Sequence, residues 1–323
     1  MGGCQRTHGL MQGSRWAGWI ATGGAVILAV ATFIGAMSSG PPEPTRADWQ
    51  AARDHIRQEF RPGDGIRVDP VWMREGASII APLDPKTGEP PSTIDLTTPA
   101  DPYFVVRHKR LWLVSALDRS TLPSSWEGVE LQDRSTIGES LVVSRYGAPA
   151  SPIETELLSL LDTANVVRMA PGQPLRQCTW HGDVHRCRGR SWEDVRIQFV
   201  EVAGSPRRCL VLHPYPDGGT LRLMFEKVPL SNSILLRSGL TLEAARRAEG
   251  SDVTVVVTVN GEERLQWQEP RNGWKWTDHW VDTQSMKGVT GTIQIDVTAL
   301  EEEFRDVCLD GYILSSIVPD EHS

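Results

Sequence analysis

The chain has 323 residues, of which 40% are hydrophobic, and a net charge of −8. Arg6 and Arg15 are the only charged residues among the first 40, so the remaining residues carry a net charge of −10. A body of this length suits two domains of about 150 residues each. Its acidic charge argues against nucleic acid and anionic lipid headgroups as main partners, because both are bound chiefly by clustered Lys and Arg.

An uncharged run of 22 residues, 16–37, predicts one membrane-spanning helix. About 20 apolar residues are enough to cross the hydrocarbon layer as a helix. Residues 1–15 contain Arg6 and Arg15 and no acid, so they are predicted to form a cytoplasmic tail. We therefore expect a single-pass protein of the inner (cytoplasmic) membrane, with its body in the periplasm.

Residues 38–45 are predicted to be a Pro-rich spacer that holds the body away from the membrane. A cleaved signal peptide is the alternative to an uncleaved anchor, because small residues lie at positions 35, 36, 38 and 39. The apolar stretch of such peptides is usually about 7–15 residues long, so the length of the run favours the anchor.

Four cysteines lie in the second half of the chain: Cys178, Cys187, Cys209 and Cys308. A two-residue turn at Gly182 and Asp183 would place Cys178 opposite Cys187, at a position where the Cα atoms of antiparallel strands lie about 4.5 Å apart. That separation is within disulfide range, and Cys209 would then pair with Cys308. Two disulfides favour an exported domain. Four buried thiols in a reducing compartment are the alternative.

The first region of the body, 46–148, alternates helical and strand-like segments. It begins with a helix in which Thr45 is the cap and Ala47, Ile56 and Phe60 are the apolar positions. Further helices are predicted at 71–80 and 103–109, the latter opened by Asp101-Pro102; strands at 66–69, 111–115, 129–132 and 140–146; and a long loop at 81–100. This alternation predicts a small three-layer α/β domain.

Three segments of this region carry a resemblance: ARDHIRQEFRPGDGIRV, RLWLVS and ESLVVSRYG. They resemble the soluble α/β portion that follows the membrane helices of some multi-pass lipid-linked-sugar glycosyltransferases. The catalytic acids of that family lie in loops of the membrane part, which this chain lacks. The resemblance therefore implies an envelope-facing relative without the catalytic half, and it supplies no catalytic residue.

The second region, 149–319, is almost wholly strand-like and is followed by a short tail, 320–323. Strands are predicted at 195–202, 208–212, 220–228, 233–237, 253–268, 291–300 and 307–317. Short strands with turn signals at such intervals predict an antiparallel β-sandwich. The whole chain is then an α+β multi-domain protein, with a transmembrane helix, a small α/β domain and a C-terminal sandwich.

The clearest hairpin of the second region turns at an Asn-Gly dipeptide, 260–261, the preferred pair for a type I′ turn. A simple register places Val256 opposite Leu265 and Thr254 opposite Trp267. We expect the face that carries these four residues to be the core face.

This hairpin, the stretch GWKWTDHWVDTQSMKGVTGTIQIDVTAL and the closing strand CLDGYIL carry a second resemblance. In this order they resemble the jelly-roll sandwiches of the galactose-binding-like and carbohydrate-binding-module kind. The resemblance implies a jelly roll that binds a ligand, with a glycan as the expected ligand.

The candidate ligand-binding residues lie in the Trp-rich stretch: Trp274, Trp276, Asp278, His279 and Trp280. Indole faces can stack on the C–H faces of sugar rings, while Asp and His can bind hydroxyl groups. Trp274 and Trp276 would share one face of an extended segment. The alternative is that two of the three indoles pack in the core, as large aromatic side chains usually do.

A second candidate site follows the strand at 66–69, where α/β sheets tend to bind ligands. Its residues are Asp69, Trp72, Arg74 and Glu75. The alternative is that they are loop residues and residues of a solvated helix face.

His181, Asp183 and His185 form an H-x-D-x-H string, and imidazole and carboxylate are common zinc ligands. In the hairpin predicted above, however, Asp183 lies in the turn and the two histidines point to opposite faces. We therefore predict no metal site, and no cofactor. Trp180 would lie opposite His185, and both would cover the disulfide.

The sequence contains no G-x-S-x-G elbow and no H-E-x-x-H motif. The leading hypothesis is a non-catalytic, membrane-anchored envelope protein whose sandwich binds a carbohydrate. One alternative is an accessory subunit that docks onto other envelope proteins, and another is a hydrolase that acts on envelope polymer.

Overall fold

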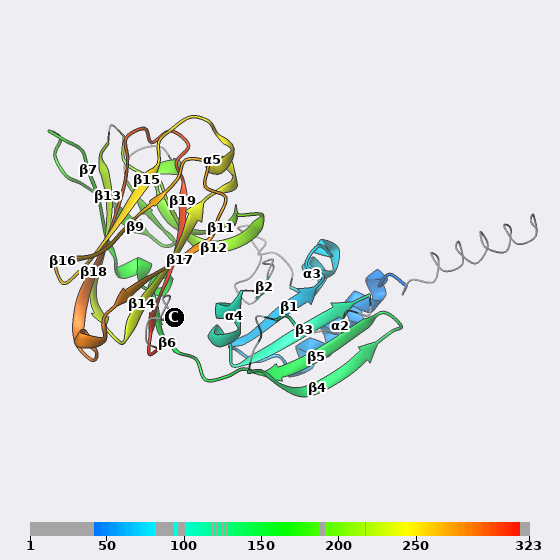
Figure 1. Ribbon diagram of the computed structural model, residues 1–323. Helices are drawn as coiled ribbons and strands as arrows, with labels where there is room; N and C mark the ends of the chain where they lie inside the picture. The colour runs from blue at the N-terminus through cyan, green and yellow to red at the C-terminus, as the bar shows by residue number, and fades with distance from the viewer. Residues whose placement is uncertain are drawn as a thin grey trace, which may run out of the picture.

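The computed structural model describes residues 42–316 apart from 82–93, 96–100, 118, 120–121, 125, 127, 188–190 and 217. Within this part of the chain, no helix is both long enough and apolar enough to cross a membrane. The predicted cytoplasmic tail and anchor, the first half of the spacer and the tail at 320–323 lie outside the described residues. Figure 1 shows a sheet with its helices, joined by a short connection to a larger β-rich body.

The first region contains the helices α2 (Arg46–Glu59), α3 (Arg74–Ile80) and α4 (Pro102–Arg107), and the strands β1 (Asp64–Asp69), β2 (Ile94–Asp95), β3 (Arg110–Ala116), β4 (Glu130–Ile137) and β5 (Leu141–Gly147). The strands form one mixed sheet in the order β2-β1-β3-β5-β4. β1 runs parallel to both of its neighbours, and β5 runs antiparallel to both of its own. β2 lies inside the stretch 81–100, which the sequence predicted to be one loop.

Two apolar clusters cover the two faces of this sheet. One contains side chains of α2 and α3 packed on Val68 and Trp112, and the other contains Phe104 of α4 packed on Leu111 and Leu113. Successive residues of β3 therefore point to opposite faces, as the pleat requires. The arrangement is the three-layer one that the alternation of elements predicted.

Helix α2 begins where the sequence predicted. The hydroxyl of Thr45 accepts a hydrogen bond from the backbone N–H of Asp48, whose carboxylate accepts one from the N–H of Thr45. The buried face carries Trp49, Ala52 and Ile56. Ala47 is exposed, so its predicted apolar contact was wrong, because the buried stripe begins two residues later.

His108, at the end of α4, couples the stability of this region to pH. Its ring lies 4.4 Å from that of Phe104, and its Nε2 has no hydrogen-bond partner among the described residues. Burial, together with the charge of Arg107, lowers the pKa of His108 to about 4. In the unfolded chain His108 takes up a proton near pH 6.5. The stability that depends on neutral His108 is therefore fully present above about pH 6.5 and is lost as the pH falls towards about 4.

We expect His108→Phe to remove this part of the pH dependence, because phenylalanine keeps the contact with Phe104 and cannot be protonated. This contribution of His108 to the free energy of unfolding is roughly 3 kcal/mol at most. Urea unfolding at pH 7 and at pH 4.5 measures it as the difference between two midpoints. A variant that keeps the wild-type difference would contradict the role given to His108.

The second region is built from fourteen strands. They are β6 (Ile153–Glu156), β7 (Asn165–Met169), β8 (Arg176–Gln177), β9 (Thr179–His181), β10 (Val184–Arg186), β11 (Val195–Val202), β12 (Ser205–Leu212), β13 (Thr220–Pro229), β14 (Ser233–Leu240), β15 (Val253–Val259), β16 (Glu262–Glu269), β17 (Thr277–Asp282), β18 (Thr290–Ala299) and β19 (Val307–Leu314). The short helices are η1 (Leu157–Thr163), η2 (Ser191–Glu193), α5 (Leu242–Arg246) and η3 (Gln284–Met286).

These strands form two antiparallel sheets that pack face to face as a β-sandwich. One sheet has eight strands in the order β17-β14-β19-β12-β11-β10-β9, with β6 also paired to β19. The other has six, in the order β16-β15-β18-β13-β7-β8. One apolar cluster from both sheets fills the space between them. The predicted sandwich is confirmed, and the finer jelly-roll class stays a prediction.

On β16 the core face is the one predicted, because Leu265 and Trp267 pack against the core, but on β15 it is the opposite one. Val255 and Val257 are fully buried, whereas Val256 is only half-buried. Val257 pairs with Leu265 and Thr258 with Glu263, which leaves Arg264 as the extra residue of a bulge. One extra residue shifts the register by one and exchanges the two faces of a strand.

Both predicted disulfides are present. Cys178 and Cys187 lie at the open end of the β9–β10 hairpin, with Cα atoms 4.1 Å apart, and the paired residues are those predicted, His181 with Val184 and Trp180 with His185. The second disulfide joins Cys209 of β12 to Cys308 of β19 across neighbouring strands of the eight-stranded sheet.

Candidate functional site

The predicted tryptophan cluster does not form one surface. The stretch that carries Trp274 and Trp276 is irregular rather than extended. Trp274 is 45% exposed. Trp276 is partly buried, with the guanidinium groups of Arg207 and Arg237 at 5.3 Å and 5.5 Å from its ring.

The other predicted residues lie on β17 and point to opposite sides of the sheet. Trp280 packs against Leu235 and Tyr312, and Asp278 accepts a hydrogen bond of 3.0 Å from Arg237. His279 faces the other way and stacks on Trp267 with 4.1 Å between ring centroids. The five residues therefore lie in three different environments, and among their rings only that of Trp274 is exposed.

The polar side chains around His279 include the residue types of a catalytic site, but not its hydrogen-bond arrangement. The hydroxyl of Ser238 and the indole N–H of Trp267 both donate to Glu269, and the Nε2 of His279 lies 3.8 Å from the same carboxylate. Ser238 is fully buried and donates to the carboxylate rather than to an imidazole. A nucleophilic serine must be reached by its substrate, and the fully buried Ser238 is not accessible, so we interpret this group as a structural network.

The second predicted group lies around the start of α3. Trp72 is 59% exposed, and Arg74 and Glu75 are exposed as well. Glu75 pairs with Arg46 at 3.9 Å, with both side chains in solvent. Asp69 ends β1 on the strand itself. These four residues lie at and after the end of β1, as predicted, but their side chains line none of the clefts described below.

An open cleft that combines an aromatic ring with polar side chains lies beside the β9–β10 hairpin. We call it the hairpin cleft; it has a volume of about 890 Å³ and is lined by Asp162, Ala164, Leu175, Arg176, Gln177, Cys178, Thr179, Trp180 and His185. Ligand sites in proteins commonly have volumes of about 300–1,000 Å³. The cleft offers an indole, a carboxylate, a guanidinium, an amide and a hydroxyl.

His185 and Trp180 form the fixed wall of the hairpin cleft. The Nε2 of His185 donates to the carbonyl oxygen of Leu161 at 2.7 Å, and the two rings lie 4.9 Å apart. Burial lowers the pKa of His185, so the ring is neutral at pH 7. Its Nδ1 is then an acceptor, and it has no hydrogen-bond partner among the described residues.

The H-x-D-x-H string is divided by the hairpin, as predicted. His185 lines the hairpin cleft, whereas His181 and Asp183 line a second cleft, which has mostly polar lining residues. Across the residues that the structure describes, no three His, Cys, Asp or Glu side chains gather in a way that could hold a metal ion.

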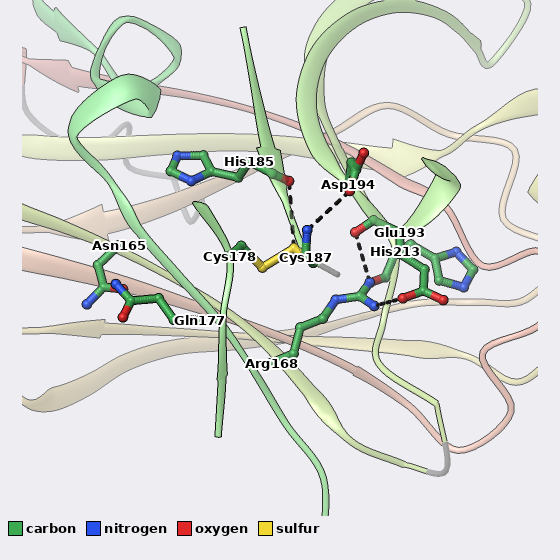
Figure 2. Close-up of a disulfide and its surroundings, with 9 residues drawn as sticks. All are labelled: Asn165, Arg168, Gln177, Cys178, His185, Cys187, Glu193, Asp194 and His213. Carbon is green, nitrogen blue, oxygen red and sulfur yellow. Dashed lines mark hydrogen bonds and ion pairs between the residues drawn. A yellow bond between two sulfur atoms is a disulfide. The ribbon is translucent and has the colours of Figure 1, made fainter. Parts of the chain in front are cut away.

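Figure 2 shows what holds the hairpin against the sandwich. The backbone N–H of Cys187 donates to Asp194 at 3.2 Å, and the disulfide ties Cys187 to Cys178. Below them, the fully buried Arg168 pairs with Glu193 and donates to its carbonyl oxygen at 3.0 Å. These contacts fix the wall of the cleft on a rigid base.

The α/β domain docks on the outer face of the eight-stranded sheet through α4, which lies on the sandwich side of its domain in Figure 1. Tyr103 stacks on Tyr312 with 5.5 Å between ring centroids. Arg237 donates to both carboxylate oxygens of Asp101 at 3.0 and 3.1 Å. Both faces of β14 and β19 are therefore buried.

Comparisons with known proteins place the chain in no family: no family model and no curated protein matches it. Among solved structures it is similar to CBM51-2 and INT domains from Clostridium perfringens ZmpB, with 10% identity and a TM-score of 0.30 over 60% of this chain and 42% of that chain. It is also similar to CBM51 from Clostridium perfringens GH95 in complex with methyl-galactose, with 10% identity and a TM-score of 0.27 over 42% of this chain and 88% of that one.

A third similar structure is CBM28, a carbohydrate-binding module specific for non-crystalline cellulose, with 13% identity and a TM-score of 0.27 over 38% of this chain and 80% of that chain. The chain spans 42% and 40% of the first two structures that it matches. Likenesses of this strength assign neither a family nor a function.

Proposed function

We propose that the sandwich binds a carbohydrate in the hairpin cleft and that the chain holds it at the outer side of the cytoplasmic membrane, without catalysing a reaction. The observation that carries the proposal is the fixed Trp180–His185 wall, with polar groups of several kinds facing the same cleft.

The chemistry of the cleft suits a sugar. The negative face of an indole attracts the weakly positive C–H groups of a sugar ring. Hydroxyl groups both donate and accept, and the cleft offers the acceptor Asp162, the donor Arg176 and the amide of Gln177, which can do both. The charges of Asp162 and Arg176 cancel, so the lining carries no strong net charge, which favours a neutral ligand.

The expected location rests on the sequence and on the disulfides. Two disulfides are typical of a domain that folds outside the reducing cytosol. The uncharged run at 16–37 supplies a segment long enough for a membrane anchor.

We expect Trp180→Ala to weaken binding of the full-length chain to its glycan at least tenfold, about the effect of truncating an aromatic side chain at the centre of an interface. A glycan array identifies the ligand, and titration calorimetry with that glycan measures the affinity. Trp72→Ala is the matched control, because it removes an exposed indole from the other domain and is expected to leave the affinity unchanged.

The variant Trp274→Ala tests whether the glycan binds in the hairpin cleft or at the predicted tryptophan stretch. Loss of binding in this variant, with Trp180→Ala unaffected, would overturn the assignment to the hairpin cleft. A full-length chain that is folded and binds no glycan on the array would overturn the carbohydrate function itself.

A further inference from the structure

A second pocket lies where α4 meets the outer face of the sandwich. We call it the interdomain pocket; it has a volume of about 40 Å³, and its lining includes Asp101, Arg107, Arg207, Arg208, Trp276 and Asp310. That volume accommodates a few water-sized groups and excludes a sugar ring, since one water needs about 10–15 Å³ by this measure. The pocket shares no lining residue with the hairpin cleft.

Two of the arginines around this pocket have strong partners. Arg107 donates to both carboxylate oxygens of Glu156, at 2.8 and 3.2 Å. Arg237, just behind the pocket, is shared between Asp101 and Asp278. Asp95 also lines the pocket and pairs with Arg67 at 2.6 Å. Together these pairs use the nearby carboxylates that are well placed for a guanidinium.

Arg207 is left with unused donors. Its side chain is only 10% exposed, and its nearest carboxylate, that of Asp101, is 3.7 Å away. Its Nε and Nη1 have no hydrogen-bond partner among the described residues. A buried guanidinium in this state carries the cost of desolvation without the hydrogen bonds that normally offset it.

Arg208 adds a second positive charge, which the carboxylates of Glu156 and Asp310 attract without a close ion pair. It is partly buried, and no described residue forms an ion pair or hydrogen bond with it. Burial, and then the charge of Arg107, lower the pKa of Arg208. Asp310 is a poor counter-ion, because it already accepts hydrogen bonds from Tyr312 and from the N–H of Gly311, and burial raises its own pKa.

We propose that the interdomain pocket binds a small oxyanion, a phosphate or sulfate group, at the guanidinium groups of Arg207 and Arg208, because both side chains line the pocket. Guanidinium groups match the oxygens of such anions with paired hydrogen bonds. Neighbouring arginines from one strand, β12, supply the donors, and α4 closes the pocket from the other domain. The anion is either a free ion or the terminal group of a larger ligand.

The test measures binding of inorganic phosphate, sulfate and methyl phosphate to the full-length chain by calorimetry, at a constant ionic strength set with chloride. We expect Arg208→Gln to bind each at least about tenfold more weakly than wild type, and Arg208→Lys to lie between the two. Methyl phosphate that binds as well as phosphate identifies a terminal group as the ligand, and phosphate alone identifies a free ion.

Arg264→Gln is the matched control. It removes an arginine that also lies on a strand but points to solvent and pairs only with its neighbour Glu262. Phosphate and sulfate also stabilise proteins generally by exclusion from their surface, an effect that all these variants keep. Equal affinities in wild type, Arg208→Gln and Arg264→Gln, or no binding to folded wild type, would overturn the proposal.

Discussion

Replacing Cys209 and Cys308 together by alanine is expected to lower the free energy of unfolding of the sandwich by about 4–5 kcal/mol. The reason is the length of chain that the disulfide closes, since the two cysteines are 99 residues apart in sequence. Closing a long loop removes many conformations from the unfolded chain. Both cysteines are fully buried and alanine is smaller than cysteine, so a small cavity adds to the loss.

The Cys178–Cys187 disulfide provides the comparison, because it closes a loop with a separation of only 9. Its double alanine variant is expected to lose about 2–3 kcal/mol by the same argument. Urea unfolding without reductant, followed by tryptophan fluorescence, measures both. A larger loss from the short loop than from the long one would contradict loop closure as the main cause.

The second large effect is expected at Arg237. Replacing it by methionine, which has a similar length and no charge, leaves Asp101 buried with only a distant arginine and Asp278 without its partner. Removing one member of a buried ion pair typically costs about 3–5 kcal/mol. The ring of Tyr103 also loses the guanidinium that lies 4.7 Å from its centroid.

Arg222→Met is the matched control. Arg222 also lies on a strand and pairs with both oxygens of an aspartate, Asp296, at 2.7 Å. Its side chain is 30% exposed, compared with 5% for Arg237, so its removal is expected to cost about 1 kcal/mol or less. Equal losses in the two variants, measured by urea unfolding, would show that burial does not set the strength of the Arg237 pairs.

The two hairpins show how far a turn dipeptide predicts register. At Gly182-Asp183 the two-residue turn fixed the pairing, and counting outward from it placed Cys178 opposite Cys187. At Asn260-Gly261 the same counting failed, because the bulge at Arg264 lies beyond the turn. The alternation in VTVVVTV was the better signal, since one face holds only valine and the other holds both threonines.

The hairpin cleft was only half visible in the sequence. Trp180 and His185 were predicted to share a face, because they belong to one hairpin. Asp162 comes from η1 and Arg176 from β8, whose position depends on its pairing with β7. The interdomain pocket is lined by residues from β2, α4, β11, β12, β19 and the stretch around Trp276, and no local pattern brings these segments together.

The position of β19 determines the order in which the two domains can fold during synthesis. This strand comes late in the chain, yet it lies in the middle of the eight-stranded sheet, between β14 and β12, and it also pairs with β6 from the start of the sandwich. The α/β domain forms its sheet from residues before 148 and can fold while the rest is being synthesised. The sandwich must wait for β19, and until then its half-built sheet has open edges that invite aggregation, which makes this the stage at which a chaperone is most needed.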